Sequence, residues 1–168
     1  ESKEASESLR KAAGRLHSMA SLYDTLYRSS GTRSGLASDY LNPLIDEIIR
    51  LTAENIDIHA VKEIEAVDLD VKTLNALGII LNELVTNSVK YAFPHAHEGR
   101  IWIRLAEEGA GMMELTYRGN GIGLPEEVLR KERTGLGMII VSSLAEQIQG
   151  TLRMRNSDGI EICITFNT

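Results

Sequence analysis

Three polar side chains that could hold a metal ion and a phosphate group recur at helical spacing. Glu83, Asn87 and Lys90 stand at positions i, i+4 and i+7, so one face of a helix would carry all three. Asn82 lies beside them, and apolar residues flank Glu83, so part of this polar row is expected to be semi-buried and to need partners. A magnesium nucleotide would supply such partners, because a hard cation binds oxygen ligands and a lysine pairs with the negative charge of phosphate. A solvated polar stripe on an ordinary amphipathic helix is the competing interpretation.

Two glycine-containing segments shift the balance toward a nucleotide. Residues 119–123 read Gly-Asn-Gly-Ile-Gly directly after a strand pattern, and such glycines let the main chain approach a ligand closely. Residues 134–137, Thr-Gly-Leu-Gly, open a helix, where exposed N–H groups at the positive end of the helix dipole form an anion seat. Neither segment fits a P-loop or a dinucleotide fingerprint. Each is a weak signal by itself.

The elements that must position these residues follow from hydrophobic periodicity and turn residues. Asp70 can cap the helix that carries the polar row, and this helix should stop before Pro94. The expected elements, in chain order, are helices over 6–27 and 41–53, a weakly indicated strand over 61–67, a helix over 71–92, a hairpin of strands over 101–105 and 113–117, a helix over 135–149, and strands over 151–155 and 160–166. This order predicts an α+β sandwich in which a largely antiparallel sheet has helices packed on one face.

Composition bounds the class of protein. The chain has 168 residues, of which 43% are hydrophobic and 25% charged, as expected of one compact domain with a short helical appendage. Its formal net charge of -6 opposes nucleic-acid binding. Cys163 lies in an alternating strand pattern, which indicates a core or half-buried position rather than a disulfide or metal site. No stretch is long and apolar enough for a membrane span, and we expect a fragment of a longer protein.

Three motifs resemble those of the GHKL or Bergerat-type ATPases, and within them the histidine kinases. Residues 82–93 resemble the N box, residues 120–125 the first glycine box and residues 135–141 the second. The resemblance extends over about residues 40–168. It implies a two-layer α/β sandwich of the Bergerat type, with a mixed, mostly antiparallel sheet, and it implies ATP and Mg as cofactors.

The resemblance also implies roles for individual residues. Asn87 would hold Mg, and Glu83 would be the catalytic residue that polarises or positions the attacking group. The residues implied to contact the nucleotide are Asn82, Asn87, Lys90, Tyr91, Gly119, Gly121, Gly123, Thr134, Gly135, Leu136, Gly137 and Thr165. Lys90 and Tyr91 would lie near the phosphates, Thr165 would support the base, and residues 124–134 would form a short lid.

Gly119 departs from the family pattern. Histidine kinases of this type carry an Asp there, which accepts a hydrogen bond from the adenine 6-amino group. A hydrogen bond to a charged group contributes about 1.5 to 3 kcal/mol, so its loss would weaken ATP binding roughly ten- to a hundredfold and reduce selectivity for adenine. An engineered change, a degenerate domain and a natural variant with another mode of base recognition are all compatible with this glycine.

The N-terminal segment indicates the subfamily. Residues 18–29 and 39–41 are similar to the second helix of the dimerisation region in the HisKA_2-like branch. We therefore assign residues 1–35 to a remnant of the dimerisation and phosphotransfer region and residues 36–168 to the ATP-binding catalytic domain. The phosphoacceptor histidine of that branch lies on a first helix that nothing here matches, and His17 lacks its surrounding residues. The resemblance implies a response-regulator receiver domain as partner, a homodimer formed through the N-terminal helix, and a cytoplasmic location.

Two rival functions stay open. In the first, the Bergerat scaffold is a catalytically inactive interaction module, and Gly119 records lost catalysis. In the second, the chain is an anti-sigma-factor serine kinase of the same fold, which the N-terminal helix disfavours. Nucleotide binding separates the first rival from the kinase interpretation.

Overall fold

The computed structural model describes residues 34–53, 56–94, 96–109, 111–130 and 135–168. Its elements in chain order are β1 (Ser34–Leu36), α2 (Ala37–Thr52), β2 (Asp57–Ile64), β3 (Asp68–Asp70), α3 (Val71–Asn87), the π-helix η1 (Ser88–Ala92), β4 (Glu98–Glu107), β5 (Met112–Gly119), α4 (Glu126–Leu129), α5 (Leu136–Gln147), β6 (Thr151–Asn156) and β7 (Ile160–Asn167). The predicted helix over 6–27 lies outside the described residues.

A five-stranded sheet forms one layer of the domain. Its strand order is β2-β4-β5-β7-β6, in which β2 runs parallel to β4 and every other neighbouring pair is antiparallel. Two further short strands, β1 and β3, pair with each other in an antiparallel ribbon. The prediction of a mixed, mostly antiparallel sheet is confirmed.

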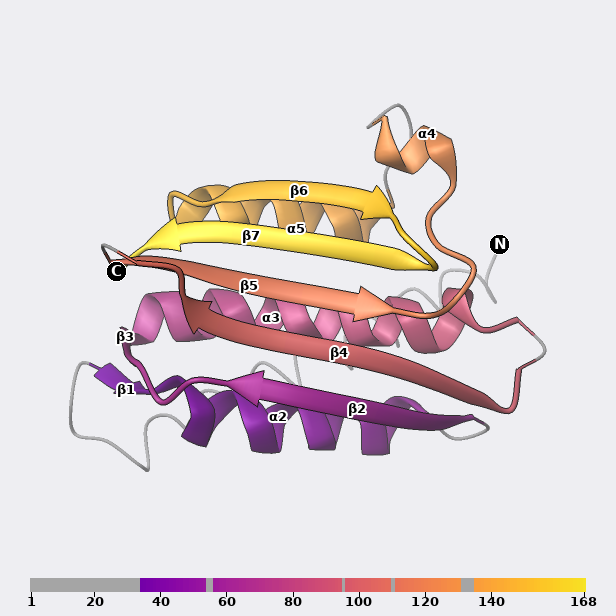
Figure 1. Cartoon of the computed structure of the whole chain (residues 1–168), viewed down its shortest axis with the longest axis horizontal. Coiled ribbons are helices and arrows are strands. Elements are labelled where there is room, and N and C mark those ends of the chain that lie inside the picture. The colour runs from indigo at the N-terminus through magenta and orange to yellow at the C-terminus, as the bar shows by residue number, and fades with distance from the viewer. Residues whose placement is uncertain (1–33, 54–55, 95, 110, 131–134) are drawn as a thin grey trace, which may run out of the picture.

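Helices α2, α3 and α5 form the second layer and cover one face of the sheet (Figure 1). Alternate strand residues explain why that face is covered: Ile101, Ile103 and Leu105 of β4 are buried, whereas Trp102 between them is 38% exposed on the opposite face. The burial of α3 on several sides follows from its central position, because it contacts both α2 and α5. The two-layer α+β sandwich with helices on one face is thus confirmed.

Helix α3, which carries the polar row, begins as predicted at the Asp70 cap. The Thr73 backbone N–H donates to Asp70 Oδ1 at 2.8 Å, which satisfies one of the free N–H groups of the first turn. The predicted single helix over 71–92 differs at its far end, where Ser88–Ala92 widen into a π-helix. Such wide turns occur frequently at functional sites.

Other boundaries depend on contacts between distant segments. The strand predicted over 61–67 begins earlier, at Asp57, because the parallel ladder with β4 pairs Asp57 with Glu98 and ends at Ile64. Helix α2 likewise begins at Ala37 rather than at 41. Strands β1 and β3 and helix α4 have three or four residues each, too few to produce a periodic pattern. Within the described ranges, no helix combines the length and apolarity that a bilayer crossing requires.

Candidate functional site

The last turns of α3 meet the first turn of α5 at a glycine. A Cβ atom added to Gly137 would lie 2.7 Å from Glu83 Oε2 and 3.1 Å from Asn87 Nδ2. Distances this short leave room for a hydrogen atom only. The polar row of α3 and the second glycine segment, which are far apart in the sequence, therefore share one site.

The electrostatic setting of this contact favours anions near α5. Gly135 caps the helix without a side-chain hydrogen bond, and the described neighbours leave open space around it, with nothing within 4 Å of an added Cβ. The N–H groups of the first helical turn carry the positive end of the helix dipole. Glu83 is 2% exposed, so its carboxylate adds a buried oxygen acceptor beside that turn.

The first glycine segment packs on η1, which directly continues the same helix. The Ile122 N–H donates to the Ala92 carbonyl of η1 at 2.9 Å, and an added Cβ at Gly121 would collide with that carbonyl. On its other side, Asn156 binds both backbone groups of Leu124, each at 2.9 Å. The segment is thereby held between η1 and the β6–β7 turn.

Gly119 ends β5 and is buried where the sheet meets η1. An added Cβ would lie 3.6 Å from Ile160 Cγ2 and 3.8 Å from both Ile101 Cγ2 and Ser88 Oγ, all ordinary van der Waals distances. Its backbone φ is not positive. A side chain at 119 would therefore begin without strain and point toward the helix layer.

Most of the predicted site residues lie on α3 and η1 or pack against them. Lys90 and Tyr91 lie on η1, and the Tyr91 side chain is 65% exposed. Asn82 is half-buried beside Glu83, and Leu136 is 63% exposed at the start of α5. The two glycine segments flank this row at Gly137 and at Gly121, as described above.

Thr165 is not brought to this cluster, which corrects the expectation that it supports the base. Burial along β7 alternates, with Ile162, Ile164 and Phe166 facing the core, so Thr165 faces the side of the sheet without helices. Its antiparallel partner is Glu114, whereas Gly119 pairs with Ile160 at the other end of β7.

The predicted lid over 124–134 is described only in part. Within it, α4 spans Glu126–Leu129 and has no buried residue. Thr134, expected to contact the nucleotide, lies outside the described residues.

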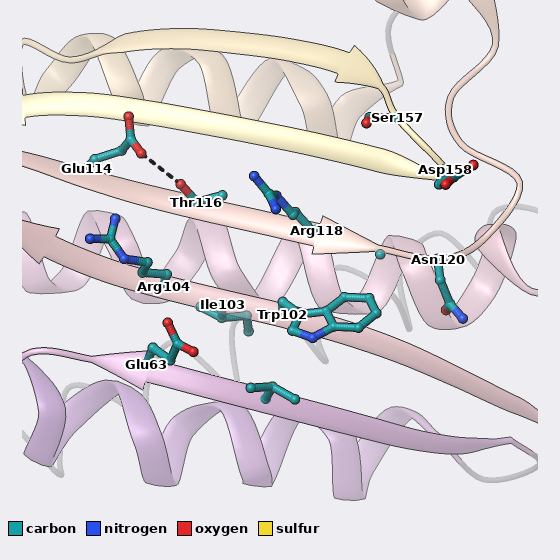
Figure 2. Close-up of a pocket in the computed structure, with 12 residues that line it drawn as sticks. Glu63, Trp102, Ile103, Arg104, Glu114, Thr116, Arg118, Asn120, Ser157 and Asp158 are labelled. Carbon is teal, nitrogen blue, oxygen red and sulfur yellow. Dashed lines mark hydrogen bonds between the residues drawn. The ribbon is translucent and has the colours of Figure 1, made fainter.

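A cavity of about 490 Å³ opens on the face of the sheet without helices, and sequence reasoning missed it. Figure 2 shows the Trp102 ring on β4, and in the sheet register this residue stands between Val61 of β2 and Arg118 of β5. Arg118 is engaged by Glu161 at 2.6 Å, and the same carboxylate binds Arg155 at 2.5 Å. The alternation around Trp102 predicted a strand, but no motif marked this face.

Comparisons with known proteins identify the family. Residues 73–168 match the family model described as histidine kinase-, DNA gyrase B-, and HSP90-like ATPase, and residues 1–52 match a model described as histidine kinase. The sensor histidine kinase PdtaS of Mycobacterium tuberculosis is 30% identical over 158 residues, which cover 92% of this chain and 31% of that protein. The sensor histidine kinase YdfH of Bacillus subtilis is 30% identical over 99 residues, 58% of this chain and 23% of that protein.

Solved structures show the same fold. The histidine kinase domain of the Erythrobacter litoralis EL346 blue-light activated histidine kinase matches with a TM-score of 0.77 at 20% identity, over 91% of this chain and 72% of that one. The mycobacterial sensor histidine kinase MprB matches with a TM-score of 0.61 at 20% identity, over 80% of this chain and 95% of that one. This chain spans less than a third of the length of the curated relatives named above. It belongs to the histidine kinase-, DNA gyrase B-, and HSP90-like ATPase family, and its homologues are sensor histidine kinases.

Proposed function

We propose that this chain is the ATP-binding catalytic part of a two-component sensor histidine kinase. The observation that carries the proposal is the contact of Gly137 with Glu83 and Asn87, since it joins a buried acid, an amide and a helix N-terminus. Oxygen ligands beside exposed N–H groups suit a magnesium triphosphate better than either group alone would.

The residues around this contact fit a magnesium ion. Asn87 offers an amide oxygen and Glu83 a carboxylate, and Mg²⁺ in phosphate sites is commonly held by one or two such groups together with the substrate phosphates. Bound with the nucleotide, Mg²⁺ would neutralise charge on the phosphate oxygens. Asn87 is the proposed metal ligand, and Glu83 is the proposed catalytic residue that positions the attacking group.

The remaining proposed contacts divide between phosphate and base. Lys90 and Tyr91 on η1 would lie near the phosphates, and so would the first turn of α5 with Gly135, Leu136 and Gly137, together with Thr134. Asn82 would also contribute to the phosphate side of the site. Gly121 and Gly123 would border the base.

In the full protein, the proposed reaction transfers the γ-phosphoryl group to a histidine elsewhere in the kinase. The bond from the γ-phosphorus to its bridging oxygen breaks, ADP keeps the electron pair, and the unprotonated imidazole nitrogen forms the new bond. Positioning and charge neutralisation supply most of the catalysis in such transfers. The phosphoryl group would then pass to an aspartate of a response-regulator receiver domain, and the N-terminal helix would form a homodimer.

Gly119 places a limit on this activity. Without the acid that the family carries there, we expect ATP binding to be weakened roughly ten- to a hundredfold, the equivalent of one hydrogen bond to a charged group. The same glycine favours the second candidate function, a catalytically inactive interaction module. Binding of the nucleotide distinguishes the two.

The test is an equilibrium titration of a fluorescent ATP analogue against the chain, with Mg²⁺ and with EDTA. We expect the analogue to bind in a magnesium-dependent way. Asn87→Ala should weaken this binding at least tenfold, because a metal ligand is lost. Thr86→Ala, at the half-buried neighbouring position of α3, serves as the matched control and should bind like the original chain. Absence of binding at millimolar analogue in the chain and in Gly119→Asp alike would establish the interaction module instead.

A further inference from the structure

Two hydroxyl groups meet behind Gly119 in a part of the core that is otherwise apolar. The Tyr117 hydroxyl donates to Ser88 Oγ at 2.7 Å and lies 3.3 Å from the Leu84 carbonyl oxygen. Tyr117 is 1% exposed and Ser88 5% exposed. Burial raises the pKa of Tyr117 well above its ordinary value, so this phenol stays protonated as a donor.

The polar atom nearest to an added Cβ at position 119 is Ser88 Oγ, at 3.8 Å. Of the three atoms nearest to an added Cβ at Gly119, two are methyl carbons of isoleucines and the third is Ser88 Oγ. After accepting from Tyr117, this oxygen keeps its own proton and a second lone pair. Because Gly119 has no side chain, none from this residue covers the hydroxyl.

The neighbouring amide is committed elsewhere. Asn120 Oδ1 accepts from the Arg100 N–H at 2.8 Å, and the Asn120 N–H donates to the Arg100 carbonyl at 3.1 Å. Asn120 is therefore tied to β4 and is a poor candidate for a second polar contact on this side of the site.

We propose that Ser88, held in place by Tyr117, is the residue through which this chain contacts the base of a bound nucleotide, and that it accepts either purine. This inference rests on the function proposed above. A carboxylate only accepts hydrogen bonds, so an acid at 119 selects the amino donor of adenine. A hydroxyl both donates and accepts. It matches the amino and ring nitrogen of adenine as well as the carbonyl and ring N–H of guanine. Ser88 is then the specificity-determining residue, and Tyr117 is a positioning residue.

The experiment compares three competitors of the fluorescent analogue, each with Mg²⁺: ATP, GTP and inorganic tripolyphosphate, which has no base. The variants are Ser88→Ala and Tyr117→Phe, with Ser142→Ala as a matched loss of a half-buried helical hydroxyl outside the three motifs. In Ser88→Ala, the Tyr117 hydroxyl retains the Leu84 carbonyl as an acceptor, so it is not orphaned. Thermal unfolding of each variant verifies that it is folded.

In the original chain, we expect ATP and GTP to bind within about threefold of each other and both to bind more tightly than tripolyphosphate. Ser88→Ala should weaken both nucleotides roughly three- to tenfold, the range of one net hydrogen bond, and leave tripolyphosphate unchanged. Tyr117→Phe should weaken both nucleotides about twofold through loss of positioning, and Ser142→Ala should change nothing.

A merely structural role of Ser88 would weaken tripolyphosphate as much as the nucleotides, and that result would overturn the inference. So would nucleotides that bind no tighter than tripolyphosphate, or an ATP affinity that Ser88→Ala leaves unchanged. Failure of the proposed function looks different, because then neither tripolyphosphate nor any nucleotide displaces the analogue from any variant, Gly119→Asp included.

Discussion

Two faces of the α3–η1 helix differ in what they offer a nucleotide. On the face toward α5, a buried carboxylate and an amide lie against a glycine whose hydrogen atom fills the available space. On the face toward β5, the atoms nearest to an added Cβ at Gly119 are two isoleucine methyl carbons and one serine hydroxyl oxygen. One site can therefore keep its phosphate chemistry while its base chemistry changes, because α5 with Gly137 contributes to the phosphate half and β5 with Gly119 to the base half.

The largest expected effect comes from closing the phosphate half. Gly137→Val places a branched side chain where Glu83 Oε2 is already 2.7 Å from an added Cβ. We expect loss of detectable nucleotide binding and a free energy of unfolding lowered by about 1–3 kcal/mol, as for other overpacked core positions. Urea unfolding and the analogue titration measure the two effects.

Gly135→Ala is the control for that variant, because an added Cβ there meets no described atom within 4 Å. It should lower the free energy of unfolding by only about 0.5–1 kcal/mol, through loss of a favourable N-cap residue and without overpacking. An equal loss of unfolding free energy in both variants would mean that the close contact of Gly137 with Glu83 does not determine the stability effect.

A smaller effect is expected when α3 is weakened far from both halves. Asp70→Ala removes the cap whose Oδ1 lies 2.8 Å from the Thr73 nitrogen, and such losses cost about 0.5–2 kcal/mol of stability. Thermal unfolding should register this loss, whereas the ratio of ATP to tripolyphosphate affinity should not change. A changed ratio would show that the two halves are not independent of the helix start.

How far the sequence predicts this arrangement depends on the distance over which each feature is determined. The Asp70 cap and the strand pattern around Trp102 are local, and both were predictable. The start of β2 at Asp57 depends on its parallel pairing with β4, which no local pattern contains. Thr165 lies on the final strand as expected, but only the register shows that it faces away from the helices.

The candidate site shows the same limit. The three motifs could be recognised one by one. The helical spacing of Glu83, Asn87 and Lys90 predicted that these three side chains share a face. The contact of Tyr117 with Ser88 joins residues from a strand and a helix, so it becomes visible only when the chain is folded. The cavity around Trp102, on the face of the sheet without helices, likewise becomes visible only once the strand order is known.

The smallest effect on binding is expected at Cys163, which lies on the face of the sheet without helices and away from both halves of the site. Burial raises the pKa of its thiol, so the folded protein holds less thiolate at a given pH than the unfolded chain. This group's contribution to stability is fully present below the pKa of the unfolded thiol and is lost as the pH rises through the folded pKa. Iodoacetamide should therefore react more slowly with the native protein than with urea-unfolded protein at pH 8.5. Alkylated protein that stays folded should bind ATP as before, and a weakened affinity would place this face of the sheet within the site.

In our interpretation, the phosphate half of the site is intact and the base half lacks its acid. The most direct test is the ATP and tripolyphosphate affinity of Gly119→Asp, measured by competition at constant Mg²⁺. We predict that ATP binds Gly119→Asp roughly ten- to a hundredfold more tightly than it binds the original chain, while tripolyphosphate affinity changes less than about twofold. An unchanged ATP affinity in a folded Gly119→Asp protein would contradict this interpretation, as would an equal gain for ATP and tripolyphosphate.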